Sequence, residues 1–349
     1  MRRLLQLLFV LLAGAGLGIR ADEGRIPIFQ PTTITSSGSY VLTRDITVAS
    51  GNVFTIQASD VTLDLNGRTV QVTSPGGYLI AIDTGASTLR VKNGALIGGQ
   101  FGIANIGGTV PILLDVEKVD FLSHGLGAIQ LTNAGDVRIS KCSFRNLGGT
   151  ATAILLQPPG PPPGLTSARI AENVFSNMRG AISTHELQSV AVLNNNISDT
   201  FFGIDLHGTT ASFLVRGNVL EQKASGGFLM GINVQNAAPP LPGALILDNV
   251  VSGFAVGMRI IASGGVRVAR NVVHRGVAGG AFAGDGILLL FNQQALLEDN
   301  QIQGNAGCGI RFDSSSSNNA YRSNMLRGNS GGAVCNSGVG NTDAGGNIL

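Results

Sequence analysis

An asparagine recurs about every 25 residues between Asn173 and Asn324, each time in the same apolar setting. The third residue before it and the second residue after it are apolar or aromatic. Successive spacings are 22, 23, 31, 22, 29 and 24 residues. The seven positions are Asn173, Asn195, Asn218, Asn249, Asn271, Asn300 and Asn324. Such a period predicts a stack of similar units, each too small to bury a core by itself.

Each unit also contains a glycine or small residue followed by alternating apolar positions, as in Gly203-Ile204-Asp205-Leu206 and Gly257-Met258-Arg259-Ile260. Alternation with period two indicates short β-strands, and no apolar pattern with helical spacing is sustained. The 50 glycines and the 13% of charged residues exclude a helix bundle. Glycine does not recur at every third position, which excludes collagen. Abundant aliphatic residues and a low net charge exclude disorder.

These patterns predict an all-β solenoid in which each unit forms one coil and pairs with the next. Asparagine suits the recurring corner because it tolerates the left-handed conformation, and stacked asparagines can form a hydrogen-bonded ladder. Val119 and Cys142 occupy the ladder position in two earlier coils. We expect about eleven coils in one domain over residues 22–349, with caps up to about residue 48 and after Asn336.

The amino-terminal segment resembles a secretory signal peptide. Arg2 and Arg3 precede an apolar run from Leu4 to Gly18, and Ala21 offers a small residue at a cleavage site. The run is short for a membrane span, although a buried amino-terminal helix is an alternative interpretation. We therefore expect residues 1–21 to be removed and the mature chain, without a membrane span, to be secreted or periplasmic.

The other bulk features predict few partners. Without residues 1–21 the chain has 20 basic and 21 acidic residues, so we expect no nucleic-acid binding. No histidine or cysteine cluster has the spacing of a metal site, and no cofactor is expected, with calcium left open. Export permits a disulfide between Cys308 and Cys335, and three buried thiols that include Cys142 are an equal alternative.

The repeat resembles the right-handed parallel β-helix of the pectin-lyase-like superfamily, in its group of exported bacterial carbohydrate-binding and sugar-hydrolase proteins. The asparagine ladder and the glycine-led strands carry this resemblance, together with Gly38-Ser39-Tyr40-Val41-Leu42 and Asn341-Thr342-Asp343. The resemblance implies three strands per coil and polysaccharide binding along the outer face of one stack. The same fold also hosts lyases, epimerases, hydrolases and inert stalks.

We assign the binding stack to the glycine-led strands. Alternation places Ile204 and Leu206 inside and Asp205 and His207 outside. His185 and His207 each lie 12 residues after their asparagine, so they should stack about 4.8 Å apart. Arg259 follows two coils after Asp205 in the same outward row. The expected catalytic set is His185, Asp205, His207 and Arg259, and the expected substrate-binding residues are Gln157, Glu186, Asn233 and Gln235.

This set suits removal of the proton α to a uronate carboxyl group. Asp205 or a histidine would act as acid or base, and Arg259 would neutralise the carboxylate. The segment from Phe202 to Gly208 resembles the aromatic-Gly-h-Asp-Pro-His-Asp signature of alginate C5-epimerases, which implies catalytic roles for Asp205 and His207. Leu206 and Gly208 depart from that signature. Proline-rich insertions at 158–164 and 239–242 would wall the site. The outward row lacks an aromatic platform, although Phe201 or Phe202 could lean into it.

Two functional classes therefore remain. The first is an exported protein that binds an acidic polysaccharide or processes it as a lyase or epimerase. The second is a non-catalytic structural or surface-interaction solenoid whose outward polar residues merely face water. Outside the predicted site, His124 and His274 are expected in solvated turns, and Gly284-Asp285-Gly286 in a tight turn rather than a calcium site.

Overall fold

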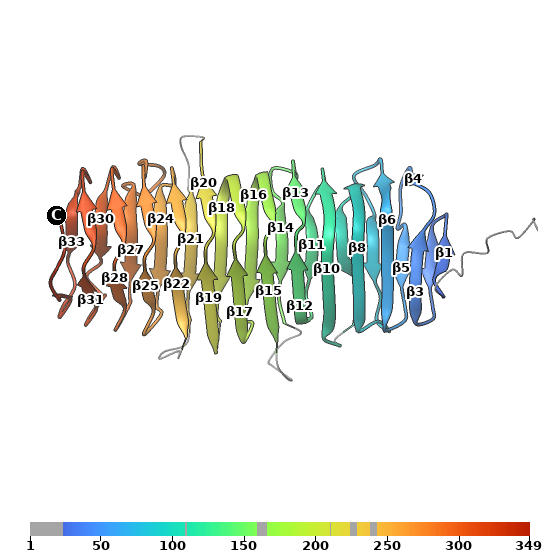
Figure 1. Cartoon of the computed structure of the whole chain (residues 1–349), viewed down its shortest axis with the longest axis horizontal. Helices are drawn as coiled ribbons and strands as arrows, with labels where there is room; N and C mark the ends of the chain where they lie inside the picture. The colour runs from blue at the N-terminus through green and yellow to red at the C-terminus, as the bar shows by residue number, and fades with distance from the viewer. Residues whose placement is uncertain (1–23, 109, 159–165, 210, 224–228, 238–242) are drawn as a thin grey trace, which may run out of the picture.

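The computed structural model describes residues 24–349, apart from residue 109 and residues 159–165, 210, 224–228 and 238–242. The predicted signal peptide and most of the two proline-rich insertions lie outside the described residues. Within these limits the chain forms 34 strands, all paired in parallel, and Figure 1 shows them stacked along one long axis. The chain forms a right-handed parallel β-solenoid of about twelve coils, which confirms the predicted fold.

The strands form three faces, and face 1 carries the predicted site. It consists of β2 (Thr32–Ile34), β5 (Phe54–Ile56), β7 (Tyr78–Ile82), β9 (Phe101–Asn105), β11 (Gly127–Leu131), β14 (Thr152–Leu156), the second halves of β16 (Val174–His185) and β18 (Asn196–His207), β21 (Met230–Gln235), β24 (Val256–Ile261), β27 (Asp285–Leu290), β30 (Cys308–Phe312) and β33 (Gly332–Asn336).

Face 2 contains the first halves of β16 and β18. Its other members are β4 (Ile46–Val48), the second halves of β6 (Val61–Val72), β8 (Thr88–Gly98) and β10 (Ile112–Leu122), and β13 (Ser143–Arg145), β20 (Val219–Glu221), β23 (Val250–Ser252), β26 (Val272–His274), β29 (Gln301–Gln303) and β32 (Met325–Arg327).

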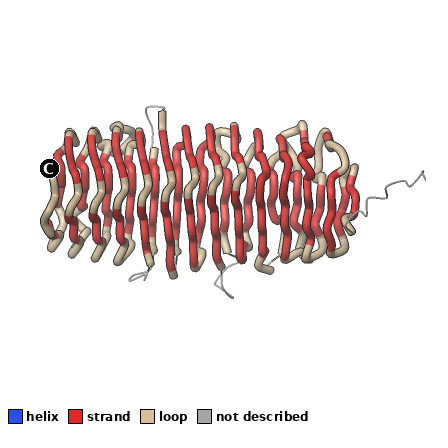
Figure 2. The backbone as a smooth tube through the Cα atoms, viewed as in Figure 1, coloured by secondary structure: helices blue, strands red, loops and turns tan. Residues whose placement is uncertain are grey.

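Face 3 contains the first halves of β6, β8 and β10. Its other members are β1 (Ile26–Ile28), β3 (Gly38–Leu42), β12 (Ala134–Ser140), β15 (Ser167–Ala171), β17 (Ser189–Leu193), β19 (Ser212–Arg216), β22 (Ala244–Leu247), β25 (Arg267–Ala269), β28 (Leu296–Glu298), β31 (Ala320–Arg322) and β34 (Thr342–Asp343). Figure 2 shows strands and loops alternating around the coils, and β6, β8, β10, β16 and β18 each continue from one face to the next.

Apolar side chains fill the inside of the coil. Alternate residues of every face point inward, so like residues stack from one turn to the next. Phe121, Phe144 and Phe175 form such a column, with ring centroids 4.8 and 4.7 Å apart. Among the described residues no helix is long and apolar enough to cross a membrane.

The predicted asparagine ladder runs along the corner between faces 3 and 2. Each ladder asparagine donates from its backbone N and its Nδ2 to the Oδ1 of the next, at 2.9–3.1 Å. The ladder starts where the N of Cys142 donates to Asn173 and ends at Asn347. Two shorter ladders, Asn305 with Asn329 and Asn319 with Asn341, line the other corners.

The predicted conformation of the ladder asparagines is wrong. The left-handed residue is the one directly before each of them, for example Glu172 (φ 59°) before Asn173 and Arg270 (φ 55°) before Asn271. That residue points outward, and its type varies. The ladder asparagine is selected instead by its buried amide, because it satisfies the backbone groups of the corner.

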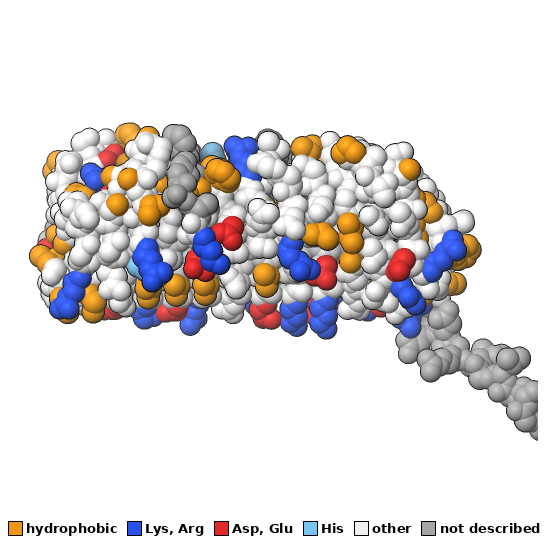
Figure 3. Space-filling model, turned by 90° about the horizontal axis from the view of Figure 1, so that it is seen from above, with side chains coloured by type: hydrophobic (Ala, Val, Ile, Leu, Met, Phe, Trp, Pro, Cys, Tyr) orange, Lys and Arg blue, Asp and Glu red, His pale blue; other side chains and the backbone are white. Residues whose placement is uncertain are grey.

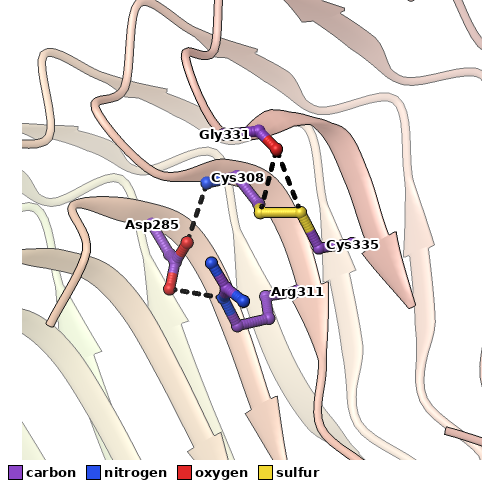
Figure 4. Close-up of a disulfide and its surroundings, with 5 residues drawn as sticks. All are labelled: Asp285, Cys308, Arg311, Gly331 and Cys335. Atoms are coloured by element: carbon purple, nitrogen blue, oxygen red, sulfur yellow. Dashed lines mark hydrogen bonds and ion pairs between the residues drawn. A yellow bond between two sulfur atoms is a disulfide. The ribbon is translucent and has the colours of Figure 1, made fainter. Parts of the chain in front are cut away.

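Three further expectations at the corners are also wrong. His124 is fully buried rather than solvated, and His274 ends strand β26. Asp285 begins strand β27 and is buried, so Gly284-Asp285-Gly286 is not a simple turn. The carboxylate of Asp285 accepts hydrogen bonds from the backbone N of Cys308 at 2.8 Å and from Nε of Arg311 at 2.9 Å (Figure 4). In this structure Cys308 and Cys335 form a disulfide, and Cys142 is a buried free thiol.

Candidate functional site

Two outward rows on face 1 bring most of the predicted residues together. The β16–β18 register pairs Ser183 with Asp205 and His185 with His207. The two imidazole rings stack with centroids 5.4 Å apart and planes 28° apart. The next strands continue the rows, with Asn233 and then Arg259 after Asp205, and Gln235 after His207. The structure therefore contains the predicted rows of equivalent residues along the solenoid axis.

Asp205 is the centre of a polar network across three strands. Nδ2 of Asn233 donates to its Oδ1 at 2.7 Å, and the hydroxyl of Ser183 donates to its Oδ2 at 3.4 Å. The same Ser183 oxygen lies 3.1 Å from Nε2 of His185. A serine hydroxyl has one proton, so while Ser183 donates to Asp205 it accepts from His185. This chain of contacts couples an imidazole to a carboxylate, a pair suited to proton transfer.

His207 has a different environment from its stacked neighbour. Its Nε2 lies 3.3 Å from Nδ2 of the exposed Asn236. An amide nitrogen can only donate, so in this contact Nε2 of His207 accepts and its proton lies on Nδ1. The two histidines thus present opposite hydrogen-bonding states in one stack.

Arg259 lies apart from this network. It is opposite Asn233 rather than Asp205, and its Nη1 lies 3.5 Å from Sδ of Met230. Its guanidinium also lies 5.6 Å from the ring centroid of Phe282. Burial lowers the pKa of Arg259, and the charge of Asp205 partly opposes this change. Arg259 thus lies in the predicted row, two strands from Asp205, and its role in neutralising a sugar carboxylate stays a prediction.

A hollow of about 250 Å³ opens directly beside Asp205. Of the predicted catalytic residues, His185 and Asp205 line it, whereas His207 and Arg259 do not. The sequence prediction missed the cation of the hollow, Arg179, whose guanidinium lies 6.0 Å from the ring centroid of Phe202. The residues that line the hollow are Thr152, Leu155, Arg179, Gly180, Ile182, Ser183, His185, Phe202 and Asp205. The available signal was Gly180, which lies opposite Phe202 within β16 and β18 and directly follows Arg179.

The remaining predicted residues lie at the edges of the network. Glu186 is exposed in a left-handed turn (φ 54°), and its backbone N donates to the carbonyl of His207. Gln157 directly follows β14, which pairs with β16, and so continues the row of His185. Gln235 lies beside His207. Within the described residues no group of three His, Cys, Asp or Glu side chains could hold a metal ion.

Comparison with known proteins identifies the fold. The model of the right-handed β-helix region matches residues 101–273 and 230–349. A solved structure, the A-module of mannuronan C-5 epimerase AlgE6 from Azotobacter vinelandii, is 13% identical over 89% of this chain and 90% of its own, with a TM-score of 0.56. The AlgE4 A-module of the same organism is also 13% identical, covering 90% and 91%, with a TM-score of 0.42.

A third similar structure is the tailspike protein of E. coli bacteriophage HK620 in complex with a hexasaccharide. It is 12% identical over 91% of this chain and 74% of that chain, with a TM-score of 0.35. A search of curated protein sequences found no match. Sequence identities of 12–13% show a similarity of fold and nothing about activity.

Proposed function

The chain belongs to the right-handed β-helix family, and we propose that it binds and processes an acidic polysaccharide on the outer face of β16 and β18. The observation that carries this proposal is the hollow beside Asp205, where a carboxylate, a serine hydroxyl and an imidazole are linked. Concave sites with a few convergent polar groups are the usual binding sites of a protein. Export of the chain remains part of this proposal.

The site chemistry suits proton abstraction from the sugar carbon α to a uronate carboxylate. A histidine or Asp205 accepts that proton as the carbon–hydrogen bond breaks. In an epimerase, a second group then returns a proton to the opposite face of the sugar. In a lyase, the adjacent carbon–oxygen bond breaks instead, a carbon–carbon double bond forms, and the leaving oxygen takes a proton. His185, Asp205 and His207 provide more than one group for either sequence.

The substrate class is supported by charge and by two resemblances. Arg179 gives the hollow a cation, which favours an anionic sugar. The Phe202–Gly208 segment is similar to the C5-epimerase signature, and one structure with this fold is named a mannuronan C-5 epimerase. Mannuronan is therefore the first polymer to test.

The test is a screen of the purified protein against mannuronan and polygalacturonate. Ultraviolet absorbance detects an unsaturated lyase product, and NMR detects epimerised residues. We expect Asp205→Asn and His185→Ala, at the two predicted catalytic residues that line the hollow, to lower the rate by roughly a hundredfold or more. Matched controls are Asp120→Asn, exposed in β10 on face 2, and His274→Ala, half-buried in β26 on face 2.

The two variants decide whether the site is correctly placed. If both retain wild-type activity and binding on every polymer that the protein acts on, the site on β16 and β18 is wrong. If the wild-type protein neither binds nor changes any polymer, the alternative of a non-catalytic structural solenoid replaces this proposal.

A further inference from the structure

A second hollow lies on the same two strands as the first. Its volume is about 230 Å³, and it is lined in part by Asn177 and Met178 of β16 and by Asp199 and Phe201 of β18. Of the residues that line the two hollows, Arg179 is the one they share. Each volume is below the roughly 300–1,000 Å³ of a typical small-molecule pocket. Each hollow thus suits a single sugar unit rather than a long stretch of polymer.

The first hollow exists because one side chain is missing from a row on face 1. The register places Gly180 between Thr152 and Phe202. A Cβ atom at Gly180 would lie 2.9 Å from Oγ1 of Thr152, so a larger residue would require the Thr152 side chain to shift. Without a side chain at this point, one side of Phe202 faces open space and borders the hollow.

Arg179 lies where the two hollows meet. Its side chain is exposed and lies over the ring of Phe202, and within the described part of the chain no carboxylate pairs with it. An unpaired guanidinium can bind a carboxylate by donating two parallel hydrogen bonds to its oxygens. Phe201, which is 49% exposed, borders the second hollow and offers an apolar surface for a sugar ring.

The positions of the hollows define a direction. Along β16 the second hollow covers Asn177 to Arg179, and the first continues from Arg179 to His185. Along β18 the order is the same, from Asp199 and Phe201 to Phe202 and Asp205. The line that joins the hollows therefore follows the strands. Figure 1 shows β16 and β18 running across the long axis of the solenoid.

We infer that the polysaccharide crosses the solenoid along β16 and β18, with Arg179 binding a sugar carboxylate between the two hollows. This inference rests on the proposed function and adds the path of the substrate to it. The sugar in the first hollow then lies against His185 and Asp205. The neighbouring sugar lies against Phe201. Only an oligomer long enough to reach both hollows uses the whole site.

The test measures binding of oligomannuronates and oligogalacturonates by calorimetry. Arg179→Gln should weaken binding about tenfold or more, because a charge-assisted pair is lost. Arg179→Lys, which keeps the charge without the fork geometry, should lose less. Phe201→Ala should weaken binding of hexamers and leave monomers unaffected. Matched controls are Arg327→Gln, exposed on β32, and Phe291→Ala, which is 61% exposed after β27.

The possible outcomes distinguish a failure of the inferred substrate path from a failure of the proposed function. If Asp205→Asn impairs the protein but Arg179→Gln and Phe201→Ala bind every oligomer like wild type, the polymer does not take this path and the inference is wrong. If the wild-type protein binds no uronate oligomer, the proposed function fails first and the inference falls with it. Equal losses in Arg327→Gln or Phe291→Ala would show a general surface effect and also overturn it.

Discussion

Single buried polar residues mark the places where a corner of the coil departs from simple repetition. His124 follows β10 and has no exposed surface. Its Nδ1 contacts the carbonyl of Gly98, which can only accept, so the proton lies on Nδ1. Nε2 is buried and lacks a hydrogen-bond partner among the described residues. Burial lowers the pKa of His124 to about 4, from an ordinary value of 6.5.

This shift makes His124 a source of acid sensitivity. Above pH 6.5 neither the folded nor the unfolded chain protonates it. Between pH 6.5 and about 4 the unfolded chain binds a proton that the folded chain refuses, so stability falls as the pH falls and levels off below about 4. The loss amounts to about 3 kcal/mol. We expect His124→Leu to remove this part of the pH dependence.

The measurement is the free energy of unfolding in denaturant, for wild type and His124→Leu, at neutral pH and at about pH 5. The variant is expected to be less stable at neutral pH, because the Gly98 carbonyl loses its donor. The informative quantity is the difference between the two pH values. An equal difference in both proteins would show that His124 is not the titrating group.

At the level of elements, the asparagine ladder occupies the corner between faces 3 and 2 in each coil from β15 and β16 to β31 and β32. Asn249 shows how densely the ladder is bonded. It donates to Asn271 from both its backbone N and Nδ2, to the carbonyl of Val215 from Nδ2, and accepts two bonds from Asn218. No other residue type offers a donor and an acceptor in this short, planar form at a fully buried corner.

Asn249→Ala should therefore destabilise the protein strongly. Its own amide is removed, and the N and Nδ2 groups of Asn218 lose their acceptor in a dry environment. We expect a loss of about 3 kcal/mol or more in the free energy of unfolding. Asn196→Ala is the matched control, since Asn196 is exposed on β18. A shift in denaturation midpoint no larger than that of the control would contradict a stabilising ladder.

At the scale of the whole molecule, the solenoid has a well-buried middle and a more exposed carboxyl-terminal end. The residues of β33 are half-buried or exposed, and Val339 is 75% exposed. The disulfide between Cys308 and Cys335 joins this last coil to the one before it, as Figure 4 shows. On the face drawn in Figure 3, charged side chains of both signs are interspersed.

Removing the disulfide should loosen the end without unfolding the middle, because each coil contacts only its neighbours. The bond closes a sequence separation of 27 residues, and such a cross-link contributes roughly 2–4 kcal/mol. Limited proteolysis of the Cys308→Ser, Cys335→Ser double variant should cleave after about residue 308 and spare the central coils. Wild type with reductant should behave like the variant. Equal cleavage with and without the bond would contradict this role.

The sequence repeat by itself determined the fold and the rows of equivalent residues that run along the solenoid axis. The stacking of His185 on His207 follows from equal distances to the ladder asparagine, because a solenoid places equivalent residues one above another. The period-two pattern likewise determined that Ile204 and Leu206 are buried while Asp205 points outward. Both features depend on local spacing, so they can be read from the chain alone.

Neighbours across corners were decided only by the tertiary structure. Arg179 lies over Phe202 of the next coil, beside the space at Gly180, and the buried His124 contacts the carbonyl of Gly98 from another coil. The Cys308–Cys335 bond was one of two sequence alternatives, and the paired β30 and β33 bring it within a Cα–Cα distance of 6.0 Å. Repetition specifies which residues stack, but the bend at each corner specifies which side chains meet.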